Sequence, residues 1–567
     1  MRKPANLVYG VEETPPPLVV LITALQHVGV IAIFMIYPLV IGREVGVTTD
    51  VLANILRMGM LALAIAVLLQ ALPRGPVGSR LLAPSSFTGV YLAPSLLAAK
   101  IGGLPLLWGM TIFAGLIEIG LSRVWTRLRT FIPSETAGLV VFLIGVNVGL
   151  AALRTLIGNS VPGTLSGASA SVAGVALAVM IGLNIWNKGQ LRLFCILIGM
   201  TVGYVAAVVA GMLTLDDFMS VVRQPLVAFP SVAHVSFAFD AALIIPFAVC
   251  ALAAAMGSTA VITTYQRTTD ADWVRPDMIS IRRGIFADGI AASTAGLLGT
   301  YGLTLATANV GLVVATGVAS RRIALLVAAI LAIGTFQPGF VAVLTIMPPP
   351  VMASALLFTA VFIMISGVQI ISTRVLDSRR TLVIGMGMMT FFIDSIFPVA
   401  FSSVPQWAQP VVDSPLVLAT LVALALNLVF RLGIRRKVTM SVDPATPDYE
   451  EVSNFVERNA AIWGARRDVV TRVAFAVTQG VEAIVEYCRP NGVIAVEIGY
   501  DEFDIDVTLT YRGDPLELTN QLPTQDEILE SEEGARRLAA FLIMQRSDKA
   551  KASASAGVAT LALHFRH

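Results

Sequence analysis

The segment from Thr300 to Arg322 carries the residues best suited to binding chemistry, because small, hydroxyl and amide side chains interrupt a run of apolar ones. Within it, Asn309, Gly311, Thr316 and Gly317 form the pattern NxGxxxxTG. In a membrane, an interrupted helix leaves backbone groups unpaired and is tolerated only where it is buried in protein or lines a wet cavity. Secondary transporters bind solutes at such interruptions. The segment is therefore predicted to form a solute-binding helix.

A second interrupted segment lies earlier in the chain, at residues 81–100, where Pro84 and Pro94 flank the sequence Ser-Ser-Phe-Thr-Gly. The alternative is that each proline only kinks its span. These two segments, however, are the third and the tenth apolar segments of the chain, so they lie seven segments apart. Paired interruptions at equivalent places in two halves indicate an inverted repeat with the site at its interface.

The composition is that of a polytopic membrane protein, because 56% of the 567 residues are hydrophobic and only 13% are charged. Soluble domains carry about 25% charged residues. Apolar segments long enough to cross about 30 Å of hydrocarbon, or slightly shorter and broken, recur along the chain. The fourteen predicted spans are residues 19–41, 51–72, 82–99, 106–121, 137–153, 171–186, 191–213, 241–265, 284–298, 303–318, 323–345, 351–371, 382–401 and 415–430.

The placement of basic residues is consistent with this number of spans. With the N-terminus in the cytoplasm, the outer loops hold only Arg43, Lys100, Arg154 and Arg223. The inner loops hold the basic clusters at residues 74–80, 123–129, 188–192, 267–283, 321–322, 374–380 and 431–437. This positive-inside bias places both termini in the cytoplasm. The three cysteines are far apart without a CxxC motif, so neither a disulfide framework nor a metal or cofactor site is predicted.

The composition changes after Lys437, and residues 438–567 have the charge density of a soluble domain. Apolar residues recur at three- and four-residue intervals in residues 449–463 and 468–487, which predicts two amphipathic helices. Residues 493–500 and 503–511 alternate as a β-hairpin. A helix at residues 533–546 and a strand at residues 558–565 complete a predicted cytoplasmic α+β domain, which is large enough to fold alone.

Several motifs make the membrane part resemble the nucleobase–ascorbate transporter family, which contains uracil, xanthine and urate permeases. They are Gln26-His27, Ser86-Phe87, FIPSETAGLVVFLIG, FADGIAASTAGLLGT and NVGLVVATGVASRR. The resemblance covers nearly all of residues 19–430. It implies a 7+7 inverted repeat in which a core domain (spans one to four and eight to eleven) rocks against a gate domain, in a homodimeric symporter of the cytoplasmic membrane.

The sequence departs from this family at the positions that the resemblance assigns to the nucleobase. Ala254 stands where related permeases have a glutamate, Ser258 replaces an aspartate or histidine, and Ala308 replaces the Gln or Glu before Asn309. A site built for ring N–H and C=O groups loses about 1–3 kcal/mol for each partner left unpaired. The glutamate is also the expected proton carrier, so standard proton symport lacks its usual group.

Other groups remain available for binding a solute. The N-termini of two half-helices offer free backbone N–H groups with a bias toward anions. A planar ring could stack on Phe87, and Asn309 and Ser86 could donate or accept hydrogen bonds. The candidate binding residues are His27, Phe34, Ser86, Phe87, Ala254, Ser258, Thr307, Ala308 and Asn309.

Three ionisable residues within spans are candidates for ion coupling: His27, Asp288 and Glu118. Each has a structural alternative. His27 could sense protons or donate to the solute, or it could be satisfied by a neighbouring helix. Asp288 could be a coupling carboxylate or could tie the ninth span to its neighbours, and Glu118 is a further coupling candidate in the fourth span.

The C-terminal domain resembles the anti-sigma-factor, histidine-kinase-like ATPase fold through VTQGVEAIVEY, two strands and TYRGDP. Glu482 matches the first residue of the E-x-x-x-N pattern, but Glu486 replaces the Mg²⁺-binding Asn. Tyr511 replaces the Asp of Asp-x-Gly, while Gly513 is retained, and KASASAGVATLAL is interpreted as a remnant of a lid and last strand. The resemblance therefore implies a regulatory or docking domain with a cytoplasmic protein partner and without ATPase activity.

The sequence thus predicts a secondary active transporter, not an enzyme, for a purine, pyrimidine or related planar solute such as xanthine, uracil or urate. Two alternatives stay open. The first is an anion carrier similar to sulfate permeases, which the missing carboxylates favour. The second is a ligand sensor that signals through the cytoplasmic domain without transport. Besides its solute, the protein is expected to contact membrane lipid and no nucleic acid.

Overall fold

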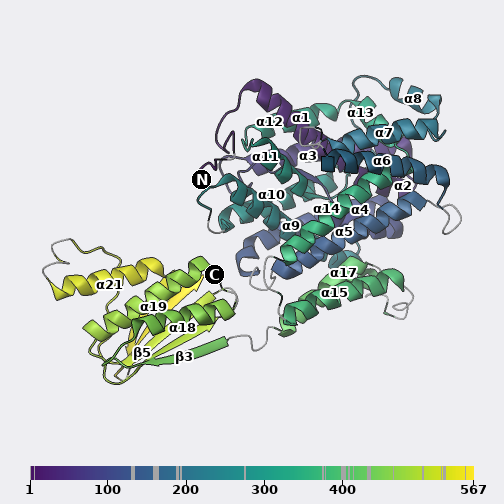
Figure 1. The fold of residues 1–567 in the computed structure, drawn as a ribbon. Helices are drawn as coiled ribbons and strands as arrows, with labels where there is room; N and C mark the ends of the chain where they lie inside the picture. The colour runs from purple at the N-terminus through teal and green to yellow at the C-terminus, as the bar shows by residue number, and fades with distance from the viewer. Residues whose placement is uncertain are drawn as a thin grey trace. The chain divides into compact units, whose positions relative to one another are not determined.

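The computed structural model divides into two compact units, Met1–Asn427 and Leu428–His567 (Figure 1). The structure describes residues 2–5, 7–128, 134–157, 165–186, 191, 194–273, 276–372, 376, 378–397, 404–405, 409–412, 414–430, 436–463, 465, 467–500, 504–524, 527, 531–555 and 557–566.

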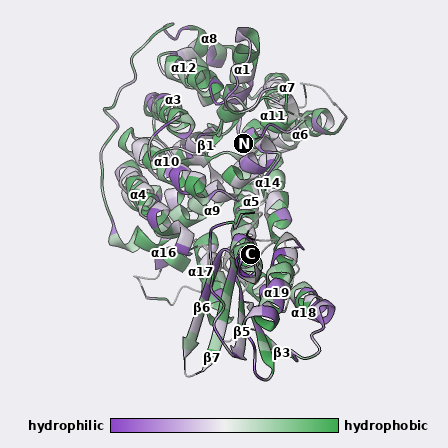
Figure 2. Cartoon of the chain, turned by 90° about the vertical axis from the view of Figure 1, so that its left-hand side faces the viewer, coloured by the Kyte–Doolittle hydropathy of each residue, from purple (hydrophilic) through white to green (hydrophobic). Residues whose placement is uncertain are grey.

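The first unit is almost entirely helical. Its longer helices are α1 (Pro17–Ile33), α3 (Thr49–Ala71), α4 (Leu92–Leu128), α5 (Ser134–Ile157), α6 (Gly167–Trp186), α7 (Cys195–Val209), α9 (Ile244–Thr269), α10 (Met278–Leu297), α12 (Ile323–Gly334), α14 (Pro349–Ile371), α15 (Ser378–Ile396) and α17 (Pro415–Phe430). Shorter helices are α2 (Ile36–Glu44), α8 (Leu215–Val222), α11 (Thr307–Thr316), α13 (Pro338–Thr345), α16 (Gln409–Val412) and the 3₁₀ turns η1 (Gly89–Tyr91) and η3 (Ala241–Leu243). The colouring by hydropathy in Figure 2 shows that hydrophobic residues predominate in these helices.

Each predicted apolar segment coincides with helical elements of this unit. The first corresponds to α1 and α2, the third and fourth to η1 and the two parts of α4, the tenth to α11, and the eleventh to α12 and α13. Residues 192–193 and 398–401 of two predicted segments lie outside the described residues. By length and composition, seven described helices could cross a membrane, or eight with the α12–α13 pair, which is bent by 79°. The count of fourteen crossings stays a prediction.

The third and fourth predicted spans follow each other almost without a connecting loop. The end of the third and all of the fourth lie within α4, which non-helical backbone at Gly102 and Gly103 divides into two helices. The φ of Gly103 is +67°, a conformation that glycine adopts without a steric penalty. The chain therefore turns sharply at this point while its hydrogen-bonded helix continues on both sides.

A two-stranded sheet interrupts the helical unit. β1 (Ser85–Phe87) pairs antiparallel with β2 (Leu303–Leu305), although 215 residues separate the two strands in sequence. Both strands are fully buried. In a protein interior, backbone groups of extended segments must find partners, and each strand supplies the partner of the other.

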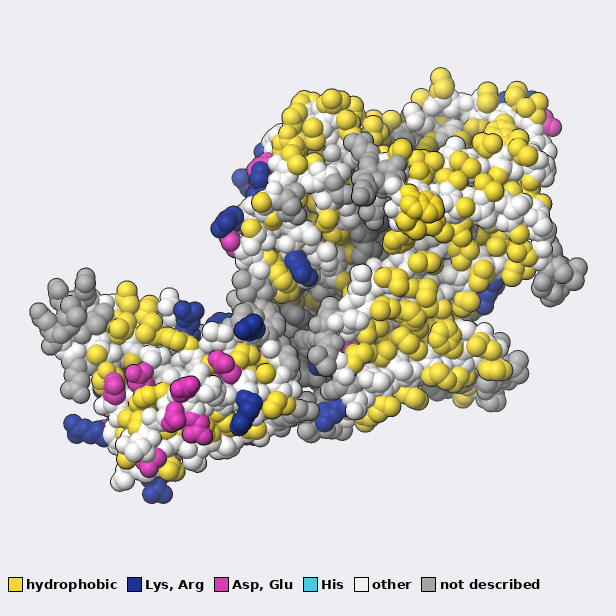
Figure 3. Space-filling view, in the orientation of Figure 1, with side chains coloured by type: hydrophobic (Ala, Val, Ile, Leu, Met, Phe, Trp, Pro, Cys, Tyr) yellow, Lys and Arg dark blue, Asp and Glu magenta, His cyan; other side chains and the backbone are white. Residues whose placement is uncertain are grey.

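The second unit is a five-stranded antiparallel sheet with helices against it. Its strands are β3 (Arg436–Val442), β4 (Ile494–Tyr500), β5 (Asp504–Arg512), β6 (Lys549–Ser555) and β7 (Val558–Arg566), in the order β3-β4-β5-β7-β6. The helices α18 (Tyr449–Ile462), α19 (Arg467–Tyr487) and α21 (Glu532–Arg546) cover one face. Figure 3 shows acidic and basic side chains gathered on this unit, in contrast to the apolar surface of the first.

The strands at the two edges of this sheet differ from the prediction. β3 begins at Arg436, before the composition change at Lys437. The first part of the segment interpreted as a remnant of a lid and last strand forms the edge strand β6, which pairs as a hairpin with the predicted last strand, β7. β6 reads KAKASAS and exposes most of its side chains, so it lacks the apolar alternation by which strands are recognised. Because β6 lies at the edge of the sheet and buries little side-chain surface, its sequence does not require alternating apolar residues.

Candidate solute-binding site

The site is built around the crossing of β1 and β2. Ser86 stands opposite Thr304 at the centre of the register, and the N–H of Ala306 continues the pairing by donating to the carbonyl oxygen of Pro84 at 3.2 Å. A helix begins directly after each strand, η1 and α4 after β1 and α11 after β2. Two helix N-termini therefore adjoin the crossing, and such N-termini favour electronegative groups.

The two helix starts are capped differently. Thr88 accepts a hydrogen bond from the N–H of Val90 at the start of η1. Ala306 occupies the N-cap of α11, and no side-chain cap is present there in the described part of the chain. The first backbone N–H groups of α11 therefore have no side-chain acceptor at the N-cap and are available to bind another acceptor, such as a solute.

Asn309 joins α11 to the first predicted span. Its Oδ1 lies 2.9 Å from Nδ1 of His27, and its Nδ2 donates a long hydrogen bond of 3.5 Å to the carbonyl oxygen of Pro84. With the amide in this orientation, Nδ1 of His27 is the donor. Both side chains are 0% exposed, and Nε2 of His27 has no partner among the described residues. The structure thus brings together two predicted site residues that are 282 positions apart.

Ser258 and Asp288 form a second polar group, which contacts β2 through Thr304. The Ser258 hydroxyl donates to Oδ2 of Asp288 at 2.5 Å and lies 3.0 Å from the Thr304 hydroxyl. Thr304 also donates to Oδ2 of Asp288. Asp288 therefore connects α10 to both α9 and β2. This contact is the structural alternative that the sequence analysis gave for Asp288. Thr304 lies in the segment from Thr300 to Arg322 but is not among the predicted site residues. Its position between the apolar residues Leu303 and Leu305 is the signal that could have identified it.

The aromatic candidates pack among other rings. Phe87 is fully buried with its ring centroid 6.0 Å from that of Tyr301, and Phe34 stacks on Tyr37 at 6.4 Å. Tyr301 also contacts Tyr37 and Tyr91. Sequence reasoning missed this tyrosine cluster because its members are far apart in the chain and share no motif.

The remaining candidate residues lie on α9, α11 and α4. Ala254 is fully buried on α9, so no polar group replaces the expected carboxylate at that position. Thr307 and Ala308 begin α11, but their side chains lie outside the described residues. Glu118 is fully buried on α4, and neither of its oxygens has a hydrogen-bond partner among the described residues.

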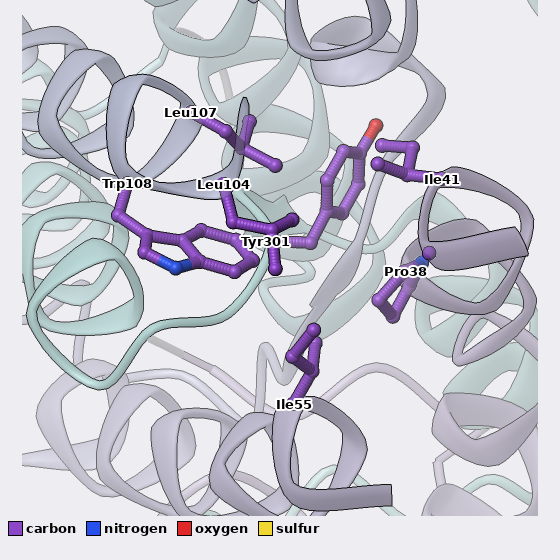
Figure 4. Close-up of a pocket in the computed structure, with 8 residues that line it drawn as sticks. Pro38, Ile41, Ile55, Leu104, Leu107, Trp108 and Tyr301 are labelled. Carbon is purple, nitrogen blue, oxygen red and sulfur yellow. The ribbon is translucent and has the colours of Figure 1, made fainter. Parts of the chain in front are cut away.

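A separate small pocket lies beside this site (Figure 4). Its lining is apolar apart from the indole of Trp108 and the phenol of Tyr301, whose hydroxyl donates to the carbonyl oxygen of Thr88 at 2.6 Å. None of the predicted site residues lines it. Because the pocket offers few polar groups to orient a solute, it is a weaker candidate for specific binding than the strand crossing.

In the second unit, Tyr511 has a structural role where the ATPase resemblance would place an aspartate. Its ring is 2% exposed within the core, and its hydroxyl donates to the carbonyl oxygen of Asp514 and accepts from the N–H of Leu516, both at 3.1 Å. Burial raises the pKa of Tyr511, so the phenol is neutral. Glu482 accepts a hydrogen bond from Gln479 at 2.6 Å.

Replacing Tyr511 by Phe is expected to lower the free energy of unfolding of the second unit by about 1–2 kcal/mol, because the buried N–H of Leu516 and the carbonyl oxygen of Asp514 lose their partner. Hydrogen exchange of the full-length protein should report faster exchange at residues 514–516. The matched control is Tyr449→Phe, since Tyr449 makes no hydroxyl hydrogen bond in the described part of the structure. Equal effects of the two substitutions would contradict this role.

These features define a multi-pass membrane transporter in which two interrupted segments meet at one buried site. The chain belongs to the permease family, whose sequence profile matches residues 19–397. It is similar to the xanthine permease XanP of Escherichia coli (strain K12), with 27% identity over 441 residues that cover 75% of this chain and 95% of XanP. It is also similar to the xanthine permease XanQ of the same strain, with 28% identity over 466 residues, 79% of this chain and 98% of XanQ.

A solved structure of SLC26A9 shares the fold. The two superpose with a TM-score of 0.53 at 12% sequence identity, over 76% of this chain and 68% of that one. At this identity the likeness concerns the arrangement of the helices alone. Family membership therefore identifies the chain as a transporter, and the nature of its solute has to be argued from the site.

Proposed function

We propose that the protein transports a nucleobase-like solute, a xanthine, uracil or urate type of ring, across the cytoplasmic membrane. The observation that carries this proposal is the meeting of Asn309, His27 and two helix N-termini at the β1–β2 crossing. An amide and an imidazole present both donors and acceptors, as the edge of a heterocyclic ring requires. The unpartnered Nε2 of His27 is a polar group that a bound solute would complete.

The names of XanP and XanQ, which are xanthine permeases, support the same class of solute. Ala254 sets this chain apart, because a methyl group cannot hydrogen-bond the ring there. Under this proposal, the ring is held by Asn309, His27, Ser86 and backbone N–H groups of α11, with Phe87, Phe34, Ser258, Thr307 and Ala308 around it.

The proposal includes the predicted topology of fourteen crossings in a 7+7 repeat with core and gate domains and both termini in the cytoplasm. The positive-inside charge bias supports that orientation. It also includes a homodimer and, for the second unit, a role in docking a cytoplasmic protein without ATPase activity. The buried Tyr511 at the position of a nucleotide-binding aspartate supports that role.

Uptake into proteoliposomes tests the proposed function. Labelled xanthine, uracil, urate and sulfate are presented separately to liposomes that contain the full-length protein. Saturable uptake of one of the three heterocycles, with competition by the unlabelled compound, is the expected result. Uptake of sulfate alone would replace the nucleobase assignment by an anion carrier, and saturable binding without uptake would indicate a sensor.

A further inference from the structure

Two carboxyl groups are buried side by side between α4 and α10. The close packing of these helices brings them together, because at Gly115 and Gly289 the two backbones approach so closely that a Cβ on either glycine would lie within about 2.8 Å of the other helix. A Cβ on Gly289 would lie 2.8 Å from the backbone N of Ile119. Glu118 and Asp288 directly precede these two contact residues, so the packing of the helices brings their carboxyl groups near each other. Both side chains are 0% exposed.

Only one of the four carboxyl oxygens of this pair accepts hydrogen bonds among the described residues. Oδ2 of Asp288 accepts from two hydroxyls, those of Ser258 and Thr304. Oδ1 of Asp288 and both oxygens of Glu118 have no hydrogen-bond partner among the described residues. Two hydroxyl donors on one oxygen favour the ionised form of Asp288, because hydrogen bonds to a carboxylate stabilise its charge. A proton on Glu118 would supply the missing donor to Oδ1 of Asp288.

The surroundings provide no positive charge for a second carboxylate. The groups that face the pair from the packed elements are Tyr91 of η1, Cys250 of α9 and the hydroxyls of Ser258 and Thr304. No Lys, Arg or His forms an ion pair with either carboxyl group within the described residues. Two adjacent carboxylates in such a place cannot both be ionised, so the pair retains one proton.

We propose that Glu118 and Asp288 form one shared-proton site that couples solute transport to the proton gradient. The proton resides on Glu118, with Asp288 as its acceptor, and it is taken up on one side of the membrane and released on the other. Release requires that the pair be exposed to water on that side of the membrane. The two carboxylates then repel each other, and this repulsion disturbs the hydrogen bond that Thr304 donates to Asp288. Since Thr304 pairs with Ser86 at the strand crossing, the protonation state reaches the solute site through β2. The coupling role of this pair rests on the proposed transport function. The sharing of one proton between Glu118 and Asp288 does not depend on that function.

Transport by the full-length protein in proteoliposomes tests the coupling. With one proton per neutral solute, a gradient of one pH unit sustains about tenfold accumulation. Glu118→Gln, which mimics the protonated acid, is expected to abolish that accumulation while retaining solute counterflow, which needs no net proton movement. Glu135→Gln is the matched control, since Glu135 is equally buried but forms an ion pair with Arg380 at 3.0 Å. The control should keep proton-driven accumulation.

Infrared spectroscopy of the purified protein tests the pair without any solute. The wild type should show a carboxylic acid C=O band that Glu118→Gln and Asp288→Asn both remove and Glu135→Gln retains. An unchanged band in Glu118→Gln, or accumulation by this variant that still follows the pH gradient, would overturn the proposal. Accumulation driven by a sodium gradient alone would overturn it as well. If the wild type transports none of the tested solutes, the proposed function fails, and the infrared result still decides whether the proton pair exists.

Discussion

Replacement of Asn309 by Leu is expected to reduce uptake of the transported solute about 100-fold. The substitution removes the partner of His27 Nδ1 and of the Pro84 carbonyl oxygen, both of which are buried. Each unpaired group costs about 1–3 kcal/mol, and about 1.4 kcal/mol corresponds to a factor of ten in affinity. Solute counterflow at a concentration below saturation measures this loss without involving a driving ion.

The control for this substitution is Asn184→Leu. Asn184 is half-buried on α6, and its contact is a weak one, with Sγ of Cys195 at 3.9 Å. The Asn184→Leu variant should show the same solute counterflow as the wild type. The apparent melting temperature of both variants separates a binding defect from misfolding. Normal counterflow by a folded Asn309→Leu variant would remove α11 from the solute site.

The largest effect on stability is expected for Gly367→Leu in the α5–α14 helix pair. A Cβ at Gly367 would lie 2.4 Å from the backbone N of Phe142 and 2.8 Å from the carbonyl oxygen of Gly138. Because these are backbone atoms, no rotation of a side chain relieves the clash, and the helices must separate. Helix association in membranes depends on such close contacts of small residues. We expect a loss of about 3 kcal/mol, seen as a lower apparent melting temperature in detergent.

Gly385→Leu provides the matched control, because a Cβ at Gly385 on α15 meets no atom within 4 Å. Its melting temperature should stay close to that of the wild type. Similar losses in both variants would show that the substitution of any helical glycine destabilises this protein, and the proposed role of the α5–α14 contact would then be wrong.

The serine at position 258 of the eighth predicted span acquires a physical interpretation from the structure. Ser258 stands where the family resemblance implies an aspartate or histidine, and its hydroxyl is bound to Asp288. The carboxylate next to this position therefore belongs to the neighbouring helix α10. A change of this kind could not be read from either segment alone, since each contains only one half of the interaction.

The sequence by itself determined the apolar segments, the two interrupted ones, the change to a soluble domain and the family resemblance. Composition, hydropathy and motifs are local properties, so they are visible in one chain without coordinates. The N-termini of α11 and η1 were predicted in this way from the broken patterns around Asn309 and Ser86.

Only the tertiary structure decided which of these residues meet. The pairing of Ser86 with Thr304, the contact of His27 with Asn309 and the approach of Glu118 to Asp288 join positions far apart in the chain. Such contacts depend on helix packing, and at Gly115 and Gly289 the absence of two side chains sets the distance. A spacing pattern along the sequence records none of these distances, because they arise from how separate elements fill a common volume.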